Sequence, residues 1–111
     1  MASGLTADEM VALWEEHLQH EFDTRDTDRT LDTMVEDAYV NHIPTLTGGY
    51  GKAELREFYS RHFIPKMPAD TELTLISRTV GEEQIVDEII VSFTHDIEMD
   101  WMLPGVPATG R

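Results

Sequence analysis

Apolar residues occupy alternate positions over the long stretch from Ile85 to Trp101. Side chains two residues apart lie on the same face of a β-strand, so the odd-numbered residues predict one inward face of an antiparallel sheet. Two ionisable residues, Asp87 and His95, interrupt that face. A buried Asp or His must be paired, be neutral or line a cavity. Two interpretations follow. In the first, Asp87 lies at a frayed strand start and His95 is a core residue whose ring nitrogens have hydrogen-bond partners. In the second, both residues line a ligand pocket.

The same stretch is too long for one ordinary strand. At about 3.3 Å per residue, residues 85–102 would extend for roughly 60 Å, well beyond the usual strand length. We therefore expect the strand to bend, bulge or break. Residues 103–111 predict a loop, and no later strand follows that could pair with the free edge. The sequence thus predicts a fold whose C-terminal strands are missing.

Two helices are expected before the first strand. Thr6 and Glu9 form a capping-box pattern, which predicts a helix from about residue 7 to residue 22. Residues 23–29 contain no apolar side chain and predict a turn. A short helix is expected next, with three apolar side chains facing inward: Leu31, Met34 and Val35.

A brief strand and a third helix are expected in the middle of the chain. Residues 38–43 favour a strand that stops at Pro44, and residues 47–51 predict a flexible glycine-rich loop. Helical spacing returns from Lys52, with four apolar residues on one stripe: Leu55, Phe58, Tyr59 and Phe63.

Residues 71–80 alternate weakly as a further strand, and a turn at 81–84 joins it to the long stretch. The order α-α-β-α-β-β predicts an α+β fold with helices on one side of an antiparallel sheet.

Composition limits the partners. The 111 residues, 41% of them hydrophobic, predict a single domain over residues 1–111. The formal net charge of −14 opposes binding to nucleic acid or to an anionic membrane. Cysteine is absent, which excludes disulfides, thiolate nucleophiles and Cys-ligated metals. The first residues lack a signal-peptide pattern and no stretch is apolar enough for a membrane span, so we expect a cytoplasmic protein.

Three segments together suggest a family. They are residues 37–44 (DAYVNHIP), residues 51–59 (GKAELREFY) and residues 104–111 (PGVPATGR), with a glycine-rich loop between the first two. In order and spacing they resemble SnoaL-like polyketide cyclases of the nuclear transport factor 2-like superfamily, which includes ketosteroid isomerase. The resemblance implies three helices and a curved antiparallel sheet that form a cone around an apolar pocket, with two further strands after the last segment. It also implies a small apolar or polyketide-like substrate, no cofactor and no metal, and a homodimer or other homo-oligomer.

The resemblance also implies site residues. His42 occupies the place of the isomerase's general-base aspartate, and a neutral His with a pKa of about 6.5 can accept a proton at neutral pH. Asp87 and His95 are the alternative bases or polar pocket groups. A hydrogen-bonded His at the pocket rim is the other interpretation of His42. The isomerase's helix tyrosine has no counterpart here, because Trp14, His17 and Leu18 surround its place.

Further residues are expected around a substrate: Trp14, Tyr39, Tyr59, His62, Phe63 and Trp101. For most of these side chains the alternative is plain hydrophobic packing, and Trp101 and Met102 also suit a dimer interface. His17 and His20 lie three residues apart and could share a metal, but an exposed helix face is favoured because no carboxylate pattern supports them.

The sequence therefore predicts a SnoaL-like enzyme that moves protons in a cyclisation, an isomerisation or a hydration. The rival hypothesis is a non-catalytic ligand-binding or dimerisation module of the same fold.

Overall fold

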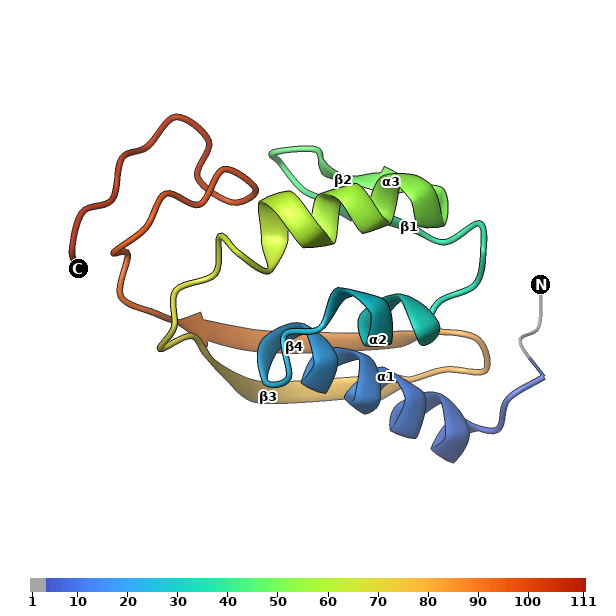
Figure 1. The fold of residues 1–111 in the computed structure, drawn as a ribbon. Helices are drawn as coiled ribbons and strands as arrows, with labels where there is room; N and C mark the ends of the chain where they lie inside the picture. Colours follow the sequence, from blue (N-terminus) through green and yellow to red (C-terminus); the bar gives the residue numbers. More distant parts are fainter. Residues whose placement is uncertain (1–3) are drawn as a thin grey trace.

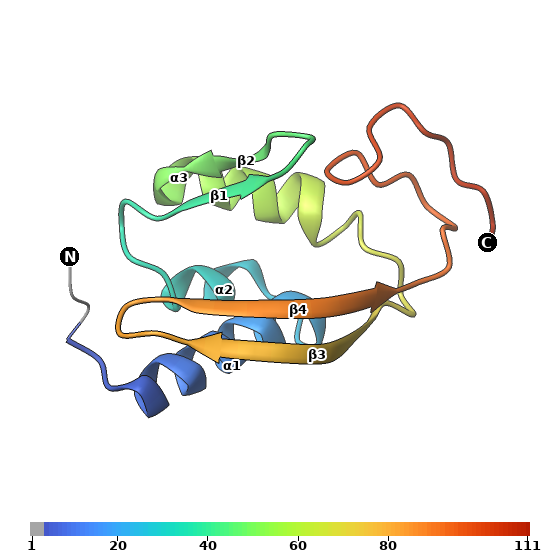
Figure 2. The same ribbon diagram turned by 180° about the vertical axis from the view of Figure 1, so that it is seen from behind.

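The computed structural model of the chain describes residues 4–111 (Figures 1 and 2). Its elements follow the order α1 (Ala7–Phe22), α2 (Thr27–Asp32), β1 (Tyr39–His42), β2 (Thr47–Tyr50), α3 (Gly51–Glu57), a π-helical segment (Phe58–Phe63), β3 (Glu72–Val80) and β4 (Ile85–Ser92). This mixture of helices and antiparallel strands confirms the α+β class.

The first helix is confirmed with its start signal. The Thr6 hydroxyl accepts a hydrogen bond from the Glu9 backbone N–H at 3.2 Å, and the Glu9 carboxylate accepts one from the Thr6 N–H at 2.9 Å. These bonds satisfy two donors that a helix N-terminus otherwise leaves free. α1 therefore begins at Ala7, as the sequence predicts.

The glycine-rich segment is a strand, and the prediction of a flexible loop there is wrong. β2 pairs antiparallel with β1, in a register that sets Tyr39 opposite Tyr50 and His42 opposite Thr47. Gly48 has a φ of +141°, and a Cβ there would collide with the Val40 carbonyl. The glycine lets the two backbones approach closely enough to pair, which composition alone does not distinguish from flexibility.

β3 and the turn after it are confirmed, but the strand predicted over residues 85–102 is wrong in length. β4 ends at Ser92, and the Asp70 carboxylate then accepts hydrogen bonds from the Thr94 N–H and hydroxyl at 2.9 and 2.6 Å. The chain leaves the sheet there as an irregular segment. His95, Met99 and Trp101 are nevertheless buried, because loop packing rather than strand pleating turns them inward.

The main core gathers around the third helix and its π-helical end. Eight buried residues form it: Leu31, Leu55, Phe58, Tyr59, Phe63, Met67, Met99 and Trp101. The helical stripe predicted from residue 55 to residue 63 is confirmed. Val35 does not face inward as predicted, because it follows α2 in a turn and is 69% exposed.

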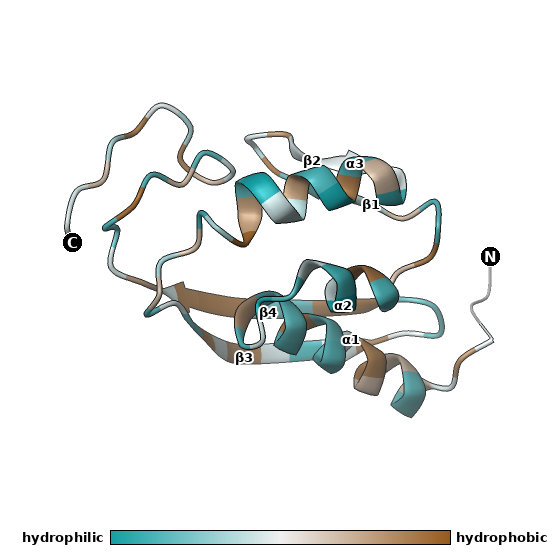
Figure 3. Ribbon diagram, in the orientation of Figure 1, coloured by the Kyte–Doolittle hydropathy of each residue, from teal (hydrophilic) through white to brown (hydrophobic). Residues whose placement is uncertain are grey.

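The described strands form two separate two-stranded sheets, β1–β2 and β3–β4, with no hydrogen-bonded ladder between them. In both views α1 lies over one face of the β3–β4 hairpin (Figures 1 and 2). Hydrophobic stretches of β3 and β4 are visible along the hairpin (Figure 3). No helix within residues 4–111 is long and apolar enough to cross a membrane.

Candidate functional site

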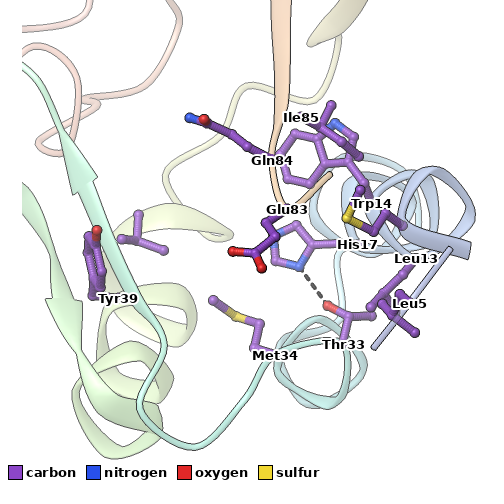
Figure 4. A pocket seen from close by; sticks show the side chains of 12 residues that line it. Leu5, Leu13, Trp14, His17, Thr33, Met34, Tyr39, Glu83, Gln84 and Ile85 are labelled. Carbon is purple, nitrogen blue, oxygen red and sulfur yellow. Dashed lines mark hydrogen bonds between the residues drawn. The ribbon is translucent and has the colours of Figure 1, made fainter. Parts of the chain in front are cut away.

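A pocket of about 450 Å³ opens between α1, the end of α2, β1 and the β3–β4 turn (Figure 4). It is lined by Leu5, Met10, Leu13, Trp14, His17, Thr33, Met34, Tyr39, Val40, Glu83, Gln84 and Ile85. Its volume is typical of sites for small molecules, and its lining is mostly apolar with few polar groups. We call this cavity the main pocket.

α1 places His17 at the wall of the main pocket. Met10, Trp14, His17 and Glu21 recur at spacings of three and four residues, which sets them on one face of the helix. Only 9% of His17 is exposed, and its ring stacks on Trp14 with a centroid distance of 5.5 Å. The predicted exposed helix face is therefore wrong for His17.

Both nitrogens of His17 have polar neighbours. Nδ1 lies 2.6 Å from the Thr33 hydroxyl, and Nε2 lies 3.3 Å from a carboxylate oxygen of Glu21. Glu21 is itself buried, with 7% of its surface exposed. Figure 4 shows the contact between His17 and Thr33 at the edge of the cavity. A hydroxyl, an imidazole and a carboxylate thus lie in sequence at the pocket wall, and the first two, from Thr33 and His17, line the pocket.

Tyr59 lies beneath this group. Its ring meets the His17 ring edge-on at 6.4 Å, and 1% of the residue is exposed. Burial raises the pKa of the Tyr59 hydroxyl, and the neighbouring Glu21 carboxylate raises that pKa further. Tyr59 therefore keeps its proton and can donate it to a hydrogen bond with Glu21, and it does not line the pocket itself.

Asp87 lies in an ion pair rather than in the pocket lining. Both of its carboxylate oxygens accept hydrogen bonds from the Arg78 guanidinium, at 2.8 and 2.9 Å, and one also accepts the indole N–H of Trp14 at 2.8 Å. Arg78 donates as well to Glu15 of α1, at 2.7 Å. The hydrogen bonds from Arg78 hold the pKa of Asp87 below its usual range. A carboxylate held in this way is suited to fixing the hairpin against α1.

His42 lies away from the main pocket, among three aromatic rings. Its ring centroid is 5.4 Å from that of Phe58, 6.0 Å from Phe63 and 5.1 Å from Trp101. Its Nδ1 lies 3.0 Å from the Thr47 carbonyl oxygen across the β1–β2 hairpin. We call these four rings the aromatic cluster. His42 lies inside it and does not line the main pocket.

A smaller cavity of about 320 Å³ adjoins the aromatic cluster. It is lined by Leu46, Thr47, Gly48, Phe58, His62, Asp100 and Trp101. His62 Nδ1 lies 3.1 Å from a carboxylate oxygen of Asp100. The structure thus brings His62 and Trp101 together here, next to His42 and Phe63.

His95 lies in a third place, against the last residues of the chain. Its backbone N–H donates to the Arg111 carbonyl at 2.8 Å, and its carbonyl accepts from the Thr109 and Gly110 N–H groups at 3.0 and 2.8 Å. The residue is 5% exposed, and its Nε2 has no hydrogen-bond partner. His42, Asp87 and His95 therefore lie in three different surroundings.

Of the residues expected around a substrate, Trp14 and Tyr39 line the main pocket. Sequence reasoning missed the role of Thr33 and Glu21 and set His17 aside. A signal was present in the sequence, because His17 and Glu21 continue the inward spacing of Met10 and Trp14. A polar pair four residues apart on an apolar helix face indicates a buried polar site.

Within the described part of the chain, no group of three or more His, Asp or Glu side chains is arranged to hold a metal ion. Comparisons with family models, with curated proteins and with solved structures find no match to this chain.

Proposed function

We propose that this chain is a SnoaL-like domain that binds a small, mostly apolar molecule in the main pocket and moves a proton on it. Cyclisation, isomerisation and hydration all use such proton transfer. The observation that carries the proposal is His17, a buried imidazole in the wall of a mostly apolar pocket of ligand size. Buried ionisable groups in such cavities are the usual candidates for acid–base work.

The chemistry follows from the neighbours of His17. The hydroxyl of Thr33, which also lines the pocket, lies 2.6 Å from Nδ1. A proton from an enolisable carbon or a bound water can therefore reach the imidazole directly or through that hydroxyl. Glu21, at 3.3 Å from Nε2, would stabilise the positive charge that the ring then carries. His42 remains the alternative base, acting from the aromatic cluster.

The arrangement of the two sheets supports the cone that the resemblance implies. Both hairpins lie on the same side of the helices, β1–β2 next to α3 and β3–β4 next to α1 and α2 (Figures 1 and 2), and residues of β1 and of the β3–β4 turn both line the main pocket. We infer that both hairpins are parts of one curved wall around that pocket.

Deuterium exchange at an enolisable ketone tests the function. In D₂O, the chain is expected to accelerate deuteration of 2-tetralone next to its carbonyl, as followed by proton NMR. His17→Gln should lower the catalysed rate by about 10²–10⁴-fold, the usual contribution of a general base. The matched control is His20→Gln, because His20 lies one turn further along α1 and does not line the pocket.

The possible outcomes separate the hypotheses. Loss of exchange in His42→Gln but not in His17→Gln would transfer the site to the aromatic cluster. A third outcome is that no deuterium exchange occurs but 2-tetralone binds saturably, as seen by a change in Trp14 fluorescence. That outcome would favour the hypothesis of a non-catalytic binding module. Trp101→Phe provides a chain in which Trp14 is the one tryptophan, since the sequence has two.

Assembly is a second candidate function, supported by the β3–β4 hairpin. Large apolar side chains remain exposed there: Leu75 at 48%, Ile76 at 52%, Val86 at 56% and Ile90 at 52%. β4 pairs only with β3 among the described strands, so its other edge is open to a second copy of the chain. Sedimentation at micromolar concentration should show a homo-oligomer, and a cooperatively melting monomer would contradict it.

A further inference from the structure

We propose that Thr33, His17 and Glu21 form a hydroxyl, imidazole and carboxylate triad, with Thr33 as a nucleophile toward small apolar esters. The inference uses the main pocket of the proposed function and assigns it a further activity, acyl transfer. Such triads are defined by the roles and distances of their groups, and not by their order in the sequence. The distances here are 2.6 Å from the hydroxyl to Nδ1 and 3.3 Å from Nε2 to the carboxylate.

The position of the imidazole proton decides whether Thr33 can be activated. The Thr33 hydroxyl donates to the Thr30 carbonyl oxygen at 2.6 Å and also lies 2.6 Å from His17 Nδ1, where the imidazole tautomer decides which atom donates. That carbonyl already accepts the Thr33 backbone N–H at 3.2 Å. The Glu21 carboxylate can only accept, so it favours a proton on Nε2. A neutral ring protonated at Nε2 has its lone pair on Nδ1, which can then accept the Thr33 hydroxyl proton in place of the Thr30 carbonyl oxygen.

Glu21 is therefore a residue that positions the His17 ring, and the Tyr59 hydroxyl in turn holds the Glu21 carboxylate in place. The buried Tyr59 hydroxyl has a raised pKa and stays protonated, so it can donate to the Glu21 carboxylate. The carboxylate is buried between the Tyr59 hydroxyl and the imidazole, where electrostatic interactions are stronger than in water. This order of groups fixes both the orientation of His17 and its tautomer.

The reaction balances with an ester and water as the reactants. Thr33 Oγ1 forms a bond to the ester carbonyl carbon as its proton passes to Nδ1, and the bond from that carbon to the leaving oxygen breaks. The leaving alcohol takes the proton, which leaves an acyl group on Thr33. Water then attacks the acyl carbon, gives a proton to Nδ1, and the proton returns to Oγ1 as the carboxylic acid departs.

Acetylation by p-nitrophenyl acetate tests this assignment on the full chain. Intact-mass spectrometry and peptide mapping should locate one acetyl group on Thr33. Nitrophenolate release should fall by about 10²-fold or more in Thr33→Val and in His17→Gln, because nucleophile and base act as a unit. Thr33→Ser should retain the reaction. Thr45→Val is the matched control, since Thr45 is a half-buried threonine beside the aromatic cluster.

The tautomer gives a second measurement that does not depend on turnover. Nitrogen-15 NMR should show His17 protonated at Nε2 in the parent chain, and Glu21→Gln should shift the proton toward Nδ1. A merely structural Glu21 would leave the tautomer unchanged and would overturn its positioning role. Acetylation at other residues, or an equal rate in His17→Gln, would overturn the triad. If 2-tetralone still binds or exchanges in the main pocket, the proposed function survives that failure.

Discussion

The region around α3 and the region around the β3–β4 hairpin are stabilised by different kinds of contact. Around α3, apolar and aromatic side chains are almost fully buried, with Leu55 at 0% and Phe63 at 3% exposure. The ring of Phe63 contacts the rings of Phe58, Tyr59 and Trp101. Burial of apolar area, the largest favourable contribution to folding, is concentrated here.

The hairpin makes a polar attachment instead. Arg78 and Asp87 face each other across β3 and β4, and they hold α1 through Glu15 and the Trp14 indole. Several large apolar side chains of the same hairpin remain about half exposed. Regular strand pairing and a hydrophobic sequence are therefore not sufficient to create a core. What packs against the strands decides how much each one contributes to stability.

The largest predicted effect contrasts one residue from each region. Phe63→Ala should lower the free energy of unfolding by about 3–5 kcal/mol, because it opens a cavity among buried rings. Leu75→Ala should lower it by less than about 1 kcal/mol, because the side chain is 48% exposed. Equilibrium urea unfolding measures both values. Equal effects would show that the hairpin is as well packed as the region around α3.

A smaller effect is expected where the region around α3 meets α1. Tyr59→Phe removes the hydroxyl beside the buried Glu21 carboxylate and retains the ring. It should lower the free energy of unfolding by about 1–3 kcal/mol, the cost of leaving a buried polar group without its donor. Tyr50→Phe is the matched control, because Tyr50 is 63% exposed. An unchanged urea midpoint in Tyr59→Phe would show that the Tyr59 hydroxyl does not stabilise the buried Glu21 carboxylate.

The ion pair and hydrogen bond of Asp87 should make the stability of the folded chain depend on pH. The pKa of Asp87 is lowered in the folded state, so its ionised form stabilises the fold above the unfolded value of about 3.9. That contribution is lost as the pH falls through the folded pKa. Asp87→Asn should therefore lower Tm at pH 7, and the difference from the parent chain should close below about pH 4. A constant difference down to pH 2 would contradict the ion pair.

The smallest effect concerns the start of α1. Residues of this helix line the main pocket and bind the β3–β4 hairpin. Thr6→Ala removes the acceptor for the Glu9 N–H and should cost about 1 kcal/mol. Thr6→Ser should restore most of that stability, because serine offers the same acceptor. Thermal unfolding followed by circular dichroism compares the three chains.

Local signals made parts of the fold predictable. The capping box at Thr6 and the apolar stripe of the third helix depend on neighbours in sequence, and both are confirmed. The end of β4 was not predictable in the same way. An irregular segment that buries His95, Met99 and Trp101 has the same alternating pattern as a strand, and the contact made where it leaves the sheet, between Thr94 and Asp70, joins residues 24 positions apart.

The candidate site was less predictable than the fold. Trp14 and Tyr39 were expected near a ligand and line the main pocket. The partners of His17 could not be foreseen together, because Thr33 follows α2 and Tyr59 lies in the π-helical segment, far apart in sequence. The four-residue spacing on α1 brings His17 and Glu21 together, and three-dimensional packing then places the Thr33 hydroxyl against the imidazole.

The way in which the hairpin is attached has a consequence for motion. The Arg78–Glu15 ion pair and the Trp14–Asp87 hydrogen bond join the hairpin to α1, and a hairpin attached in this way can separate from α1 without disturbing the rings around α3. Backbone amides of β3 and β4 should then exchange with deuterium through local opening, whereas those of the π-helical segment exchange only on global unfolding. Because the β3–β4 turn lines the main pocket, the same opening would admit a ligand and release it.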